Sequence, residues 1–282
     1  MRFGAHMSIA GGLEKSVDRA ERAGCDALQI FTKNGNQWKA KPITDEQAEL
    51  YKSRLAASEI HPVVAHDSYL INLASPDDEL WEKSIEAFRI ELERCEQLEV
   101  PFLVTHPGSY VKSTEEEGIA RIAEALNRIN RDLAGYNVMT LLETTAGQGS
   151  NIGWRFEQLA AIMAQVTEQE RVGYCFDTCH AFAAGYEIRT AGGYAETMDA
   201  FDSILGLDKL KVFHFNDSKK EFGSRRDRHD HIGAGEIGLE GFRHFVNDPR
   251  FIEHAALLET PKSDDLHEDI ENLATLRALV EK

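Results

Sequence analysis

The chain has 282 residues, 42% of them hydrophobic and 28% charged, which is the composition of a globular protein with one large domain or two ordinary ones. No apolar stretch reaches the roughly 18 residues that cross a bilayer, and the first residues, MRFGAHMSIAGG, lack the apolar core of a secretory signal, so we expect a cytoplasmic protein with no membrane partner. The formal net charge of -17 repels polyanions such as DNA at long range and, taken alone, favours a small-molecule enzyme.

Short apolar runs of β-favouring residues recur along the whole chain. In chain order they are Arg2–His6, Ala27–Phe31, Val63–His66, Phe102–His106, Val138–Glu143, Val172–Asp177, Val212–Phe215 and Ala256–Glu259. Segments with helical periodicity lie between these runs, for example Asp77–Leu98 and Glu115–Leu133. Helix-start signals occur at Thr44–Glu46, Ser75–Asp78 and Ser113–Glu115. Eight strands that alternate with helices predict an α/β fold with a parallel sheet, closed into a (β/α)8 TIM barrel.

The chain shows no sign of division into separate units. No linker rich in Pro, Gly or Ser interrupts it, so we expect a single TIM-barrel domain over residues 1–282. Two connections, Thr32–Pro42 and Asn216–Gly238, are longer than a minimal link between a strand and a helix. The spacing of the four cysteines is not that of a CxxC pair, and we expect all four to be reduced and structural. They are Cys25, Cys95, Cys175 and Cys179.

Imidazole and carboxylate side chains stand at or near the ends of seven of these runs. They are His6, His66, His106, Glu143, Asp177, His214 and Glu259. The C-terminal ends of barrel strands form the rim where active sites are built, so these groups converge on one mouth. His180 follows Asp177 by three residues, and Asp227 and His229 are two apart, which puts both on one side of an extended segment. So many acidic and imidazole groups together would be costly without cations, and they predict a metal site at the rim.

Each of these residues has a simpler interpretation when it is taken alone. A single histidine at a strand end is more often a satisfied polar residue than a ligand, and a single glutamate is commonly a helix cap or a salt-bridge partner. The coincidence along seven runs favours the metal site. Four other histidines lie in helical or loop contexts and are assigned structural roles, and His231 is interpreted as a neighbour of the site. The four are His61, His244, His254 and His267.

The donor types indicate the class of metal. Mg²⁺ prefers oxygen donors, whereas five or six imidazoles favour Zn²⁺, Mn²⁺ or Fe²⁺. Nine candidate ligands are too many for one ion and suit two or three ions with open positions for water and substrate. Clustered ions are typical of phosphoester hydrolysis, because they stabilise both the attacking and the leaving oxygen.

Nine segments spread over the chain carry a resemblance to a known family. They are GAHMSIAGG, QIFTKN with the following QW, HDSYLINLAS, THPGS, LLETTAGQG, CFDTCHAFAAGY, FHFNDSK, DRHDHIGAGEIG and LLETPK. Together they resemble endonuclease IV, the family of zinc-dependent apurinic/apyrimidinic endonucleases of base excision repair. The resemblance implies hydrolysis of the DNA backbone 5′ to an abasic site, leaving a 3′-hydroxyl and a 5′-deoxyribose phosphate. It also implies removal of blocking groups from 3′ ends, double-stranded DNA as the partner, and a monomer.

The resemblance further implies three zinc ions, with Mn²⁺ or Fe²⁺ sharing these donors. One ion would be held by His66, His106 and Glu143. The second would share Glu143 and take Asp177, His214 and Glu259. The third would be held by His180, Asp227 and His229. A hydroxide that bridges the pair of ions joined by Glu143 would attack phosphorus, the third ion would stabilise the departing 3′-oxygen, and Glu259 would also orient the nucleophile.

The expected DNA contacts lie on the long rim loops. Tyr69 and Leu70 are expected to act as wedges that fill the gap left by an extruded abasic nucleotide. The other expected contacts are polar or basic residues that would offset the acidic net charge locally. They are Asn34, Asn36, Gln37, Lys39 and Arg228. Several members of the family carry an arginine where this chain has Asn36, so this loop departs from the family pattern.

A sugar isomerase or epimerase on a similar barrel is the alternative function. Such an enzyme uses a single divalent ion, which Glu143, Asp177, His214 and Glu259 could hold. It would have no use for His66, His106, His180 and the Asp227–His229 pair. The net charge favours this alternative, and the number of candidate ligands favours the nuclease.

Overall fold

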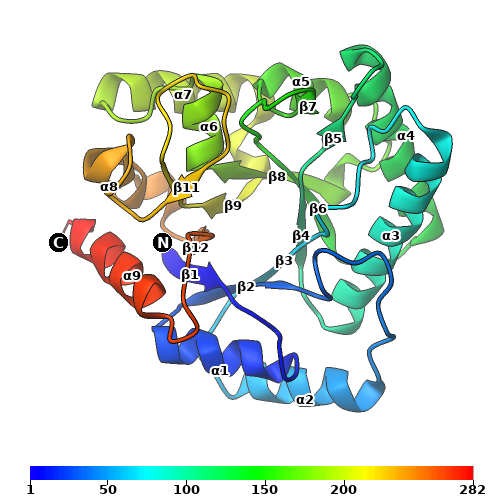
Figure 1. The fold of residues 1–282 in the computed structure, drawn as a ribbon, viewed down its shortest axis with the longest axis horizontal. Helices are drawn as coiled ribbons and strands as arrows, with labels where there is room; N and C mark the ends of the chain where they lie inside the picture. Colours follow the sequence, from blue (N-terminus) through cyan, green and yellow to red (C-terminus); the bar gives the residue numbers. More distant parts are fainter. Residues whose placement is uncertain (282) are drawn as a thin grey trace.

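The computed structural model describes residues 1–281, and its centre is a closed barrel of eight parallel strands ringed by helices (Figure 1). Around the barrel the strands follow the order β1, β12, β9, β8, β6, β4, β3 and β2. Their bounds are β1 Arg2–His6, β2 Ala27–Phe31, β3 Val63–His66, β4 Phe102–Thr105, β6 Met139–Glu143, β8 Val172–Asp177, β9 Leu210–His214 and β12 Ala255–Leu258. The predicted TIM barrel is confirmed.

The helices lie outside the strands, as Figure 1 shows. They are α1 Glu14–Ala23, α2 Asp45–Ala56, α3 Asp78–Gln97, α4 Glu115–Asp132, α5 Phe156–Met163, α6 Thr178–Ala184, α7 Ala191–Leu205, α8 Gly238–Val246 and α9 His267–Leu279, with 3-10 turns η1 Gln169–Arg171, η2 Leu207–Lys209 and η3 Pro249–Phe251. The predicted helix starts are confirmed, because Thr44 and Thr114 form capping boxes and Asp77 caps α3 through the amide of Leu80. Among residues 1–281, no helix is both long and apolar enough to span a membrane.

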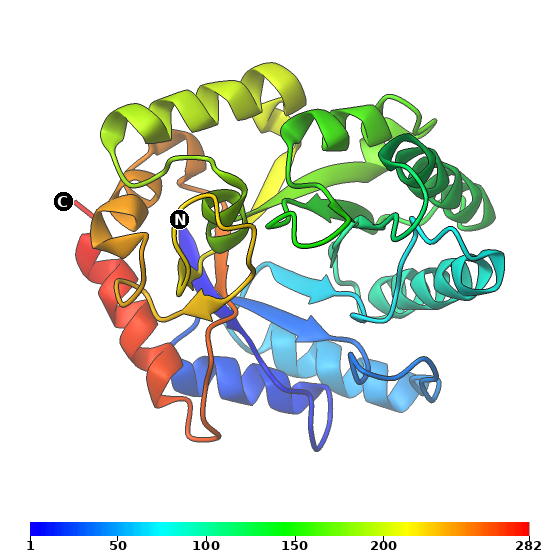
Figure 2. The same ribbon diagram turned by 45° about the horizontal axis from the view of Figure 1, so that its top comes forward.

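Two short antiparallel pairs lie in the loops that follow the strands. One joins β5 Gly108–Ser109 to β7 Asn151–Ile152, and the other joins β10 Asp217–Ser218 to β11 His229–Asp230. In Figure 2 the gold segment that carries β11 crosses in front of the barrel strands. Both pairs therefore order long connections over the same open end of the barrel.

The barrel interior is filled by one apolar cluster with a polar layer beyond it. The inward residues are Ala27, Val64, Val104, Leu141, Cys175, Val212, Ala255 and Leu257. Since side chains alternate across a strand, the residue two positions further along each strand also faces the barrel axis. This step leads from Val64 to His66, from Leu141 to Glu143 and from Cys175 to Asp177. Cys175 therefore lies deeper than the rim, and the four cysteines of the described chain are buried and free.

Several strand boundaries differ from the prediction by one or two residues. The strands expected to end in His106 and Glu259 stop one residue earlier. The amide of Glu259 donates to Asn216 Oδ1 at 2.8 Å instead of to a strand partner. The fifth predicted strand begins one residue later, at Met139, and the seventh runs from Leu210 to His214. The ends of the ladder are set by pairing with neighbouring strands, which apolar composition alone does not show.

Candidate metal centre

Nine histidine and carboxylate residues meet at the C-terminal end of the barrel in three groups. The first group is His66, His106 and Glu143, the second is Glu143, Asp177, His214 and Glu259, and the third is His180, Asp227 and His229. Within each group, one nitrogen or oxygen of every residue lies within 4.8 Å of those of the other members. These groups have the same membership as the three ligand sets implied by the sequence resemblance.

Glu143 is the residue that joins the first group to the second. Its Oε2 lies 3.3 Å from His66 Nε2 and 3.4 Å from His106 Nε2. Its Oε1 lies 3.0 Å from His214 Nδ1 and 3.1 Å from His180 Nδ1. The carboxylate is completely buried at the end of β6. Each of its two oxygens therefore faces a different pair of imidazoles, as these distances show.

The second and third groups meet at Asp177. Its Oδ2 lies 3.9 Å from His214 Nδ1 in the second group and 3.7 Å from His229 Nε2 in the third. Within the second group, His214 Nδ1 is 3.4 Å from Glu259 Oε2. Within the third, Asp227 places Oδ2 3.2 Å from His180 Nε2 and Oδ1 3.2 Å from His229 Nε2. The three groups thus form one continuous cluster.

The electrostatics of the cluster favour positive charge between the carboxylates. Burial opposes protonation of His66, yet the hydrogen bond to Glu143 and the charge of Glu259 raise its pKa to about 10. Burial likewise opposes protonation of His229, but Asp177 and Asp227 raise its pKa to about 9. Burial works against the charged form of Glu143 as well, and the surrounding imidazoles still hold its pKa well below the usual range. Metal cations at the mouth would supply the positive charge that these buried carboxylates require.

The donors fit divalent transition metals. Two donors on a tetrahedral zinc ion, with bonds of about 2.1 Å, lie roughly 3.4 Å apart, which is close to the spacing of the imidazole and carboxylate atoms described above. The Nε2 of His229 is buried without a hydrogen-bond partner among the described residues, although Asp227 Oδ1 is nearby. A buried polar atom without a partner is costly unless a ligand satisfies it. The mixture of imidazole and carboxylate donors suits Zn²⁺, Mn²⁺ or Fe²⁺.

The other histidines lie outside these groups. His6 is at the mouth, where its Nδ1 is 3.1 Å from Gln29 Nε2, and burial lowers its pKa to about 3. His231 contacts Asn272, 3.1 Å away. His244 stacks on Tyr194, and His61, His254 and His267 also lie away from the mouth. His267 stands near Asp265 and Glu268 in an exposed group.

Comparison with known proteins identifies the family. Residues 17–279 match the family described as the xylose isomerase-like TIM barrel. The chain is 56% identical over 280 residues to a probable endonuclease 4 of Chloroflexus aurantiacus, covering 99% of this chain and 98% of that one. It is similar to the crystal structure of endonuclease IV from Thermus thermophilus, with 38% identity, a TM-score of 0.88, and coverage of 99% and 98%.

The chain belongs to the endonuclease IV family. The resemblance inferred from its motifs is thereby confirmed. The barrel itself is shared more widely, because the chain also matches D-psicose 3-epimerase of Clostridium cellulolyticum with a TM-score of 0.71 at 16% identity over the whole of both chains. That likeness concerns the fold alone.

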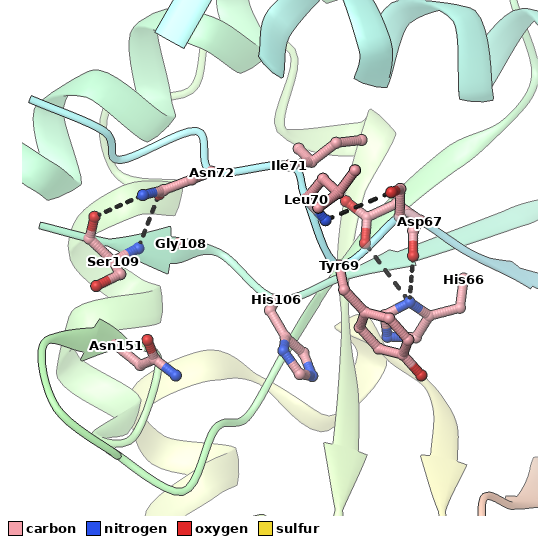
Figure 3. Close-up of a pocket in the computed structure, with 11 residues that line it drawn as sticks. His66, Asp67, Tyr69, Leu70, Ile71, Asn72, His106, Gly108, Ser109 and Asn151 are labelled. Carbon is pink, nitrogen blue, oxygen red and sulfur yellow. Dashed lines mark hydrogen bonds and ion pairs between the residues drawn. The ribbon is translucent and has the colours of Figure 1, made fainter. Parts of the chain in front are cut away.

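In this member of the endonuclease IV family, a pocket opens beside the first group (Figure 3). Tyr69 and His66 lie side by side on one wall, with ring centroids 5.9 Å apart, and Asn72, Ser109 and Asn151 lie at the far end. Tyr69 is in a turn after β3 and is 61% exposed. No helix begins at this turn, so the Tyr69 side chain is not packed against a helix and is accessible at the mouth.

The predicted DNA-contact loops lie around this endonuclease IV centre. Asn34, Asn36, Gln37 and Lys39 lie on the connection after β2, and Arg228 is exposed just before β11. A hydrogen bond of 2.6 Å from the Ser68 hydroxyl to the carbonyl of Gly35 ties the β2 loop to the Tyr69 turn. A buried ion pair of 3.0 Å between Lys33 and Glu91 anchors the base of the same loop.

Sequence reasoning missed the polar residues that hold this endonuclease IV centre without joining it. Asn216 donates to Asp177 Oδ2 at 2.7 Å. The buried carboxylate of Asp217 accepts from the amides of Gly233 and Ile237, each at 2.9 Å, and so fastens the loop that carries Asp227 and His229. Gln29 contacts two members of the second group. All three residues stand in or beside the motif segments, but a search for clustered histidines and strand-end carboxylates passes over them.

Proposed function

We propose that this chain cleaves the DNA backbone 5′ to abasic sites, leaving a 3′-hydroxyl and a 5′-deoxyribose phosphate, and that it also trims blocked 3′ ends. The observation that carries the proposal is the junction of three ligand groups around Glu143 and Asp177. Membership in the endonuclease IV family supports it. A single group of four ligands would serve a sugar epimerase, and the remaining five residues would then have no task.

The residues present would hold three divalent ions, one in each group, with Zn²⁺ as the principal metal and Mn²⁺ or Fe²⁺ as substitutes. Zinc in such a site acts as a Lewis acid and brings the pKa of a coordinated water down to about 7, which supplies a nucleophile at neutral pH. Glu143 would connect the first two positions, because its two oxygens face different imidazoles. It is too deeply buried to contact DNA itself.

Glu259 is suited to a second role beyond metal binding. Its side chain is partly exposed, at 17%, whereas that of Glu143 is fully buried. One oxygen faces His214, and the other accepts from Gln29 at 2.5 Å. Held in this way at the edge of the mouth, Glu259 would orient the attacking water by accepting a hydrogen bond from it.

The rim would bind the substrate. An abasic nucleotide leaves the helix at low cost because it has no base to unstack. Tyr69, with the half-buried Leu70 beside it, would fill the space in the stack, and Lys39 and Arg228 would contact phosphates. Asn34, Asn36 and Gln37 would contact the DNA from the β2 loop. We further propose that residues 1–282 act as one domain and as a monomer in the cytoplasm.

The test combines metal content with activity on one sample. Elemental analysis should give about three ions per chain, and the same sample should incise an abasic duplex on the 5′ side of the lesion. A matched duplex without the lesion is the control. One ion per chain, no incision after zinc or manganese is added, and turnover of a ketose would together replace the nuclease with the epimerase.

A further inference from the structure

Gln29 is a buried glutamine in the polar layer of the barrel, in contact with three other side chains. It lies on β2, two residues after the inward-facing Ala27, and is 0% exposed. Its Nε2 lies 2.5 Å from Glu259 Oε1 and 3.1 Å from His6 Nδ1. Its Oε1 lies 2.7 Å from His214 Nε2. One amide therefore connects β1, β9 and the segment after β12.

The partners determine which way this amide points. The carboxylate of Glu259 can only accept a hydrogen bond, so the atom 2.5 Å from it must be the amide nitrogen of Gln29. The second hydrogen of that nitrogen is directed to His6 Nδ1, which accepts it. The amide oxygen then faces His214 Nε2, and that nitrogen must carry a proton and donate it. The arrangement satisfies both hydrogens and the oxygen of Gln29.

The consequence for His214 is that its other nitrogen, Nδ1, has a free lone pair when the ring is neutral. Nδ1 faces Glu143 Oε1 at 3.0 Å and Glu259 Oε2 at 3.4 Å, inside the second group. Three other histidines of the centre are oriented in the opposite sense, because their Nδ1 atoms lie against backbone carbonyl oxygens. These pairs are His66 with Asp67 at 2.9 Å, His180 with Thr144 at 2.9 Å and His229 with Glu259 at 3.3 Å. Of these four histidines, His214 is the one whose ring is held by a side-chain amide.

We propose that Gln29 is a positioning residue for the second group, which fixes the tautomer of His214 and the carboxylate of Glu259 and thereby sets how tightly that group holds its metal ion. The inference rests on the proposed function, since it takes the second group to bind an ion. Partners of this kind, which hold a metal ligand without touching the metal, typically change metal affinity by about 10- to 100-fold. Asn216 acts in the same way on the far side of the group, where it donates to Asp177.

The test variant is Gln29→Met, which keeps the length of the side chain and removes both kinds of hydrogen bond. The matched control is Gln158→Met, because Gln158 is 1% exposed and hydrogen-bonded through both its amide nitrogen and its amide oxygen, but lies on α5 and contacts Glu115 and Gly153 instead of the centre. Zinc-loaded samples of wild type and both variants would be dialysed against a graded series of chelator concentrations, and the zinc retained per chain would be measured.

We expect Gln29→Met to lose one of its ions at a chelator concentration at least about tenfold lower than wild type. The curve for Gln158→Met should coincide with wild type, even though both substitutions remove a buried amide. A Gln29→Met curve that coincides with wild type would overturn the inference. Far-ultraviolet circular dichroism would establish that each variant is folded.

A second variant keeps the inference testable if Gln29→Met does not fold. His6 is only partly buried, and His6→Leu removes the ring nitrogen that accepts the second hydrogen of the Gln29 amide. It should weaken retention of the same ion by a smaller factor, and unchanged retention would count against the inference. The wild-type sample separates the two hypotheses. If wild type fails to hold three ions or to incise, the proposed function fails and the inference fails with it. If wild type does both and the variants behave as wild type, only the role of Gln29 is lost.

Discussion

The carboxylate of Asp177 accepts a hydrogen bond of 2.7 Å from the backbone amide of His180, three residues further along the chain. Asp177 is thus the N-cap of α6, and the cap fixes the first turn on which His180 is carried. Asp177 Oδ2 is left to face His214 and His229, while the His180 ring faces Asp227. One turn of chain therefore supplies side chains to two of the three groups.

Glu143→Gln should remove the connection between the first two groups. The amide has the same size but carries no charge and offers one oxygen instead of two, and it would leave four imidazoles without their shared carboxylate. We expect incision of an abasic duplex to fall by about a hundredfold to a thousandfold, the loss typical when one group that stabilises the transition state is removed. Zinc content should fall in parallel. Steady-state kinetics and elemental analysis check both, and activity within about tenfold of wild type would contradict the bridging role.

Tyr69→Ala should weaken action on abasic DNA without destabilising the protein. The side chain is largely exposed, and a stacked aromatic contributes about 1–3 kcal/mol to nucleic-acid binding. We expect kcat/KM to fall by about tenfold or more, with zinc content unchanged. Leu50→Ala is the matched control, since Leu50 is 53% exposed on α2, away from the mouth. Equal kinetics for the two variants would rule out a wedge at position 69.

Lys39→Ala and Arg228→Ala should change the salt dependence of binding more than the preference for the lesion. Each cation that neutralises one phosphate contributes about -0.9 to the slope of log K against log salt concentration. Loss of either side chain should make the slope shallower by about 1, for abasic and intact duplexes alike. Fluorescence anisotropy at several salt concentrations measures this. Unchanged slopes would place the DNA elsewhere on the rim.

Lys33→Met should destabilise the fold strongly. The pair between Lys33 and Glu91 is almost entirely buried, at 4% and 1% side-chain exposure, and loss of one partner leaves a buried charge that costs about 3–5 kcal/mol. Lys15→Met breaks an exposed pair with Asp18 and should cost under about 1 kcal/mol. Urea unfolding compares the two. The double variant Lys33→Met with Glu91→Met should recover much of the lost free energy of unfolding. A further decrease in that free energy would show that the unpaired charge of Glu91 is not the cause of the destabilisation.

The thiols should react slowly in the folded protein. Burial raises the pKa of Cys25 to about 12 and that of Cys95 well above its usual range, so the reactive thiolates are scarce at about pH 8. An unfolded thiol has a pKa of about 8.5. In the folded chain the neutral thiol is favoured, so the stability that depends on keeping Cys25 protonated is fully present below about pH 8.5 and is lost as the pH rises toward about 12. Titration with a thiol reagent, with and without denaturant, checks the reactivity. Unfolding measured at about pH 8 and about pH 10 checks whether the free energy of unfolding falls as the pH rises.

The barrel could be predicted because eight apolar runs alternate with helical segments along the chain. The clustering of histidines and carboxylates at its mouth could be predicted because side chains alternate along each strand. Val64 and Leu141 face the barrel axis, so His66 and Glu143, two residues further on, face the same way at the mouth. Asp227 and His229 could be placed only as a pair, since the path of their loop depends on contacts far away in sequence.

Gln29 and Lys33 show what the sequence did not reveal. Gln29 lies two residues after the inward-facing Ala27, so the sequence indicates that its side chain also points inward. Its partners come from β1, β9 and the segment after β12, which the sequence does not indicate. Lys33 looks like a solvated loop residue, and only the folded chain brings Glu91 of α3 beneath it. A charged residue in a polar segment is usually exposed, and nothing local marks this exception.

The fastening of β11 to β10 has a consequence for how the third group is attached to the barrel. Asp227 and His229 belong to a side loop that Asp217 ties down through backbone amides, whereas the first two groups stand on or directly after barrel strands. Closure of the barrel does not use this loop. We therefore expect that a shortened loop would leave the first two groups on an intact barrel, and that a comparable loop grafted onto a related barrel could add a third group without redesign of the strands.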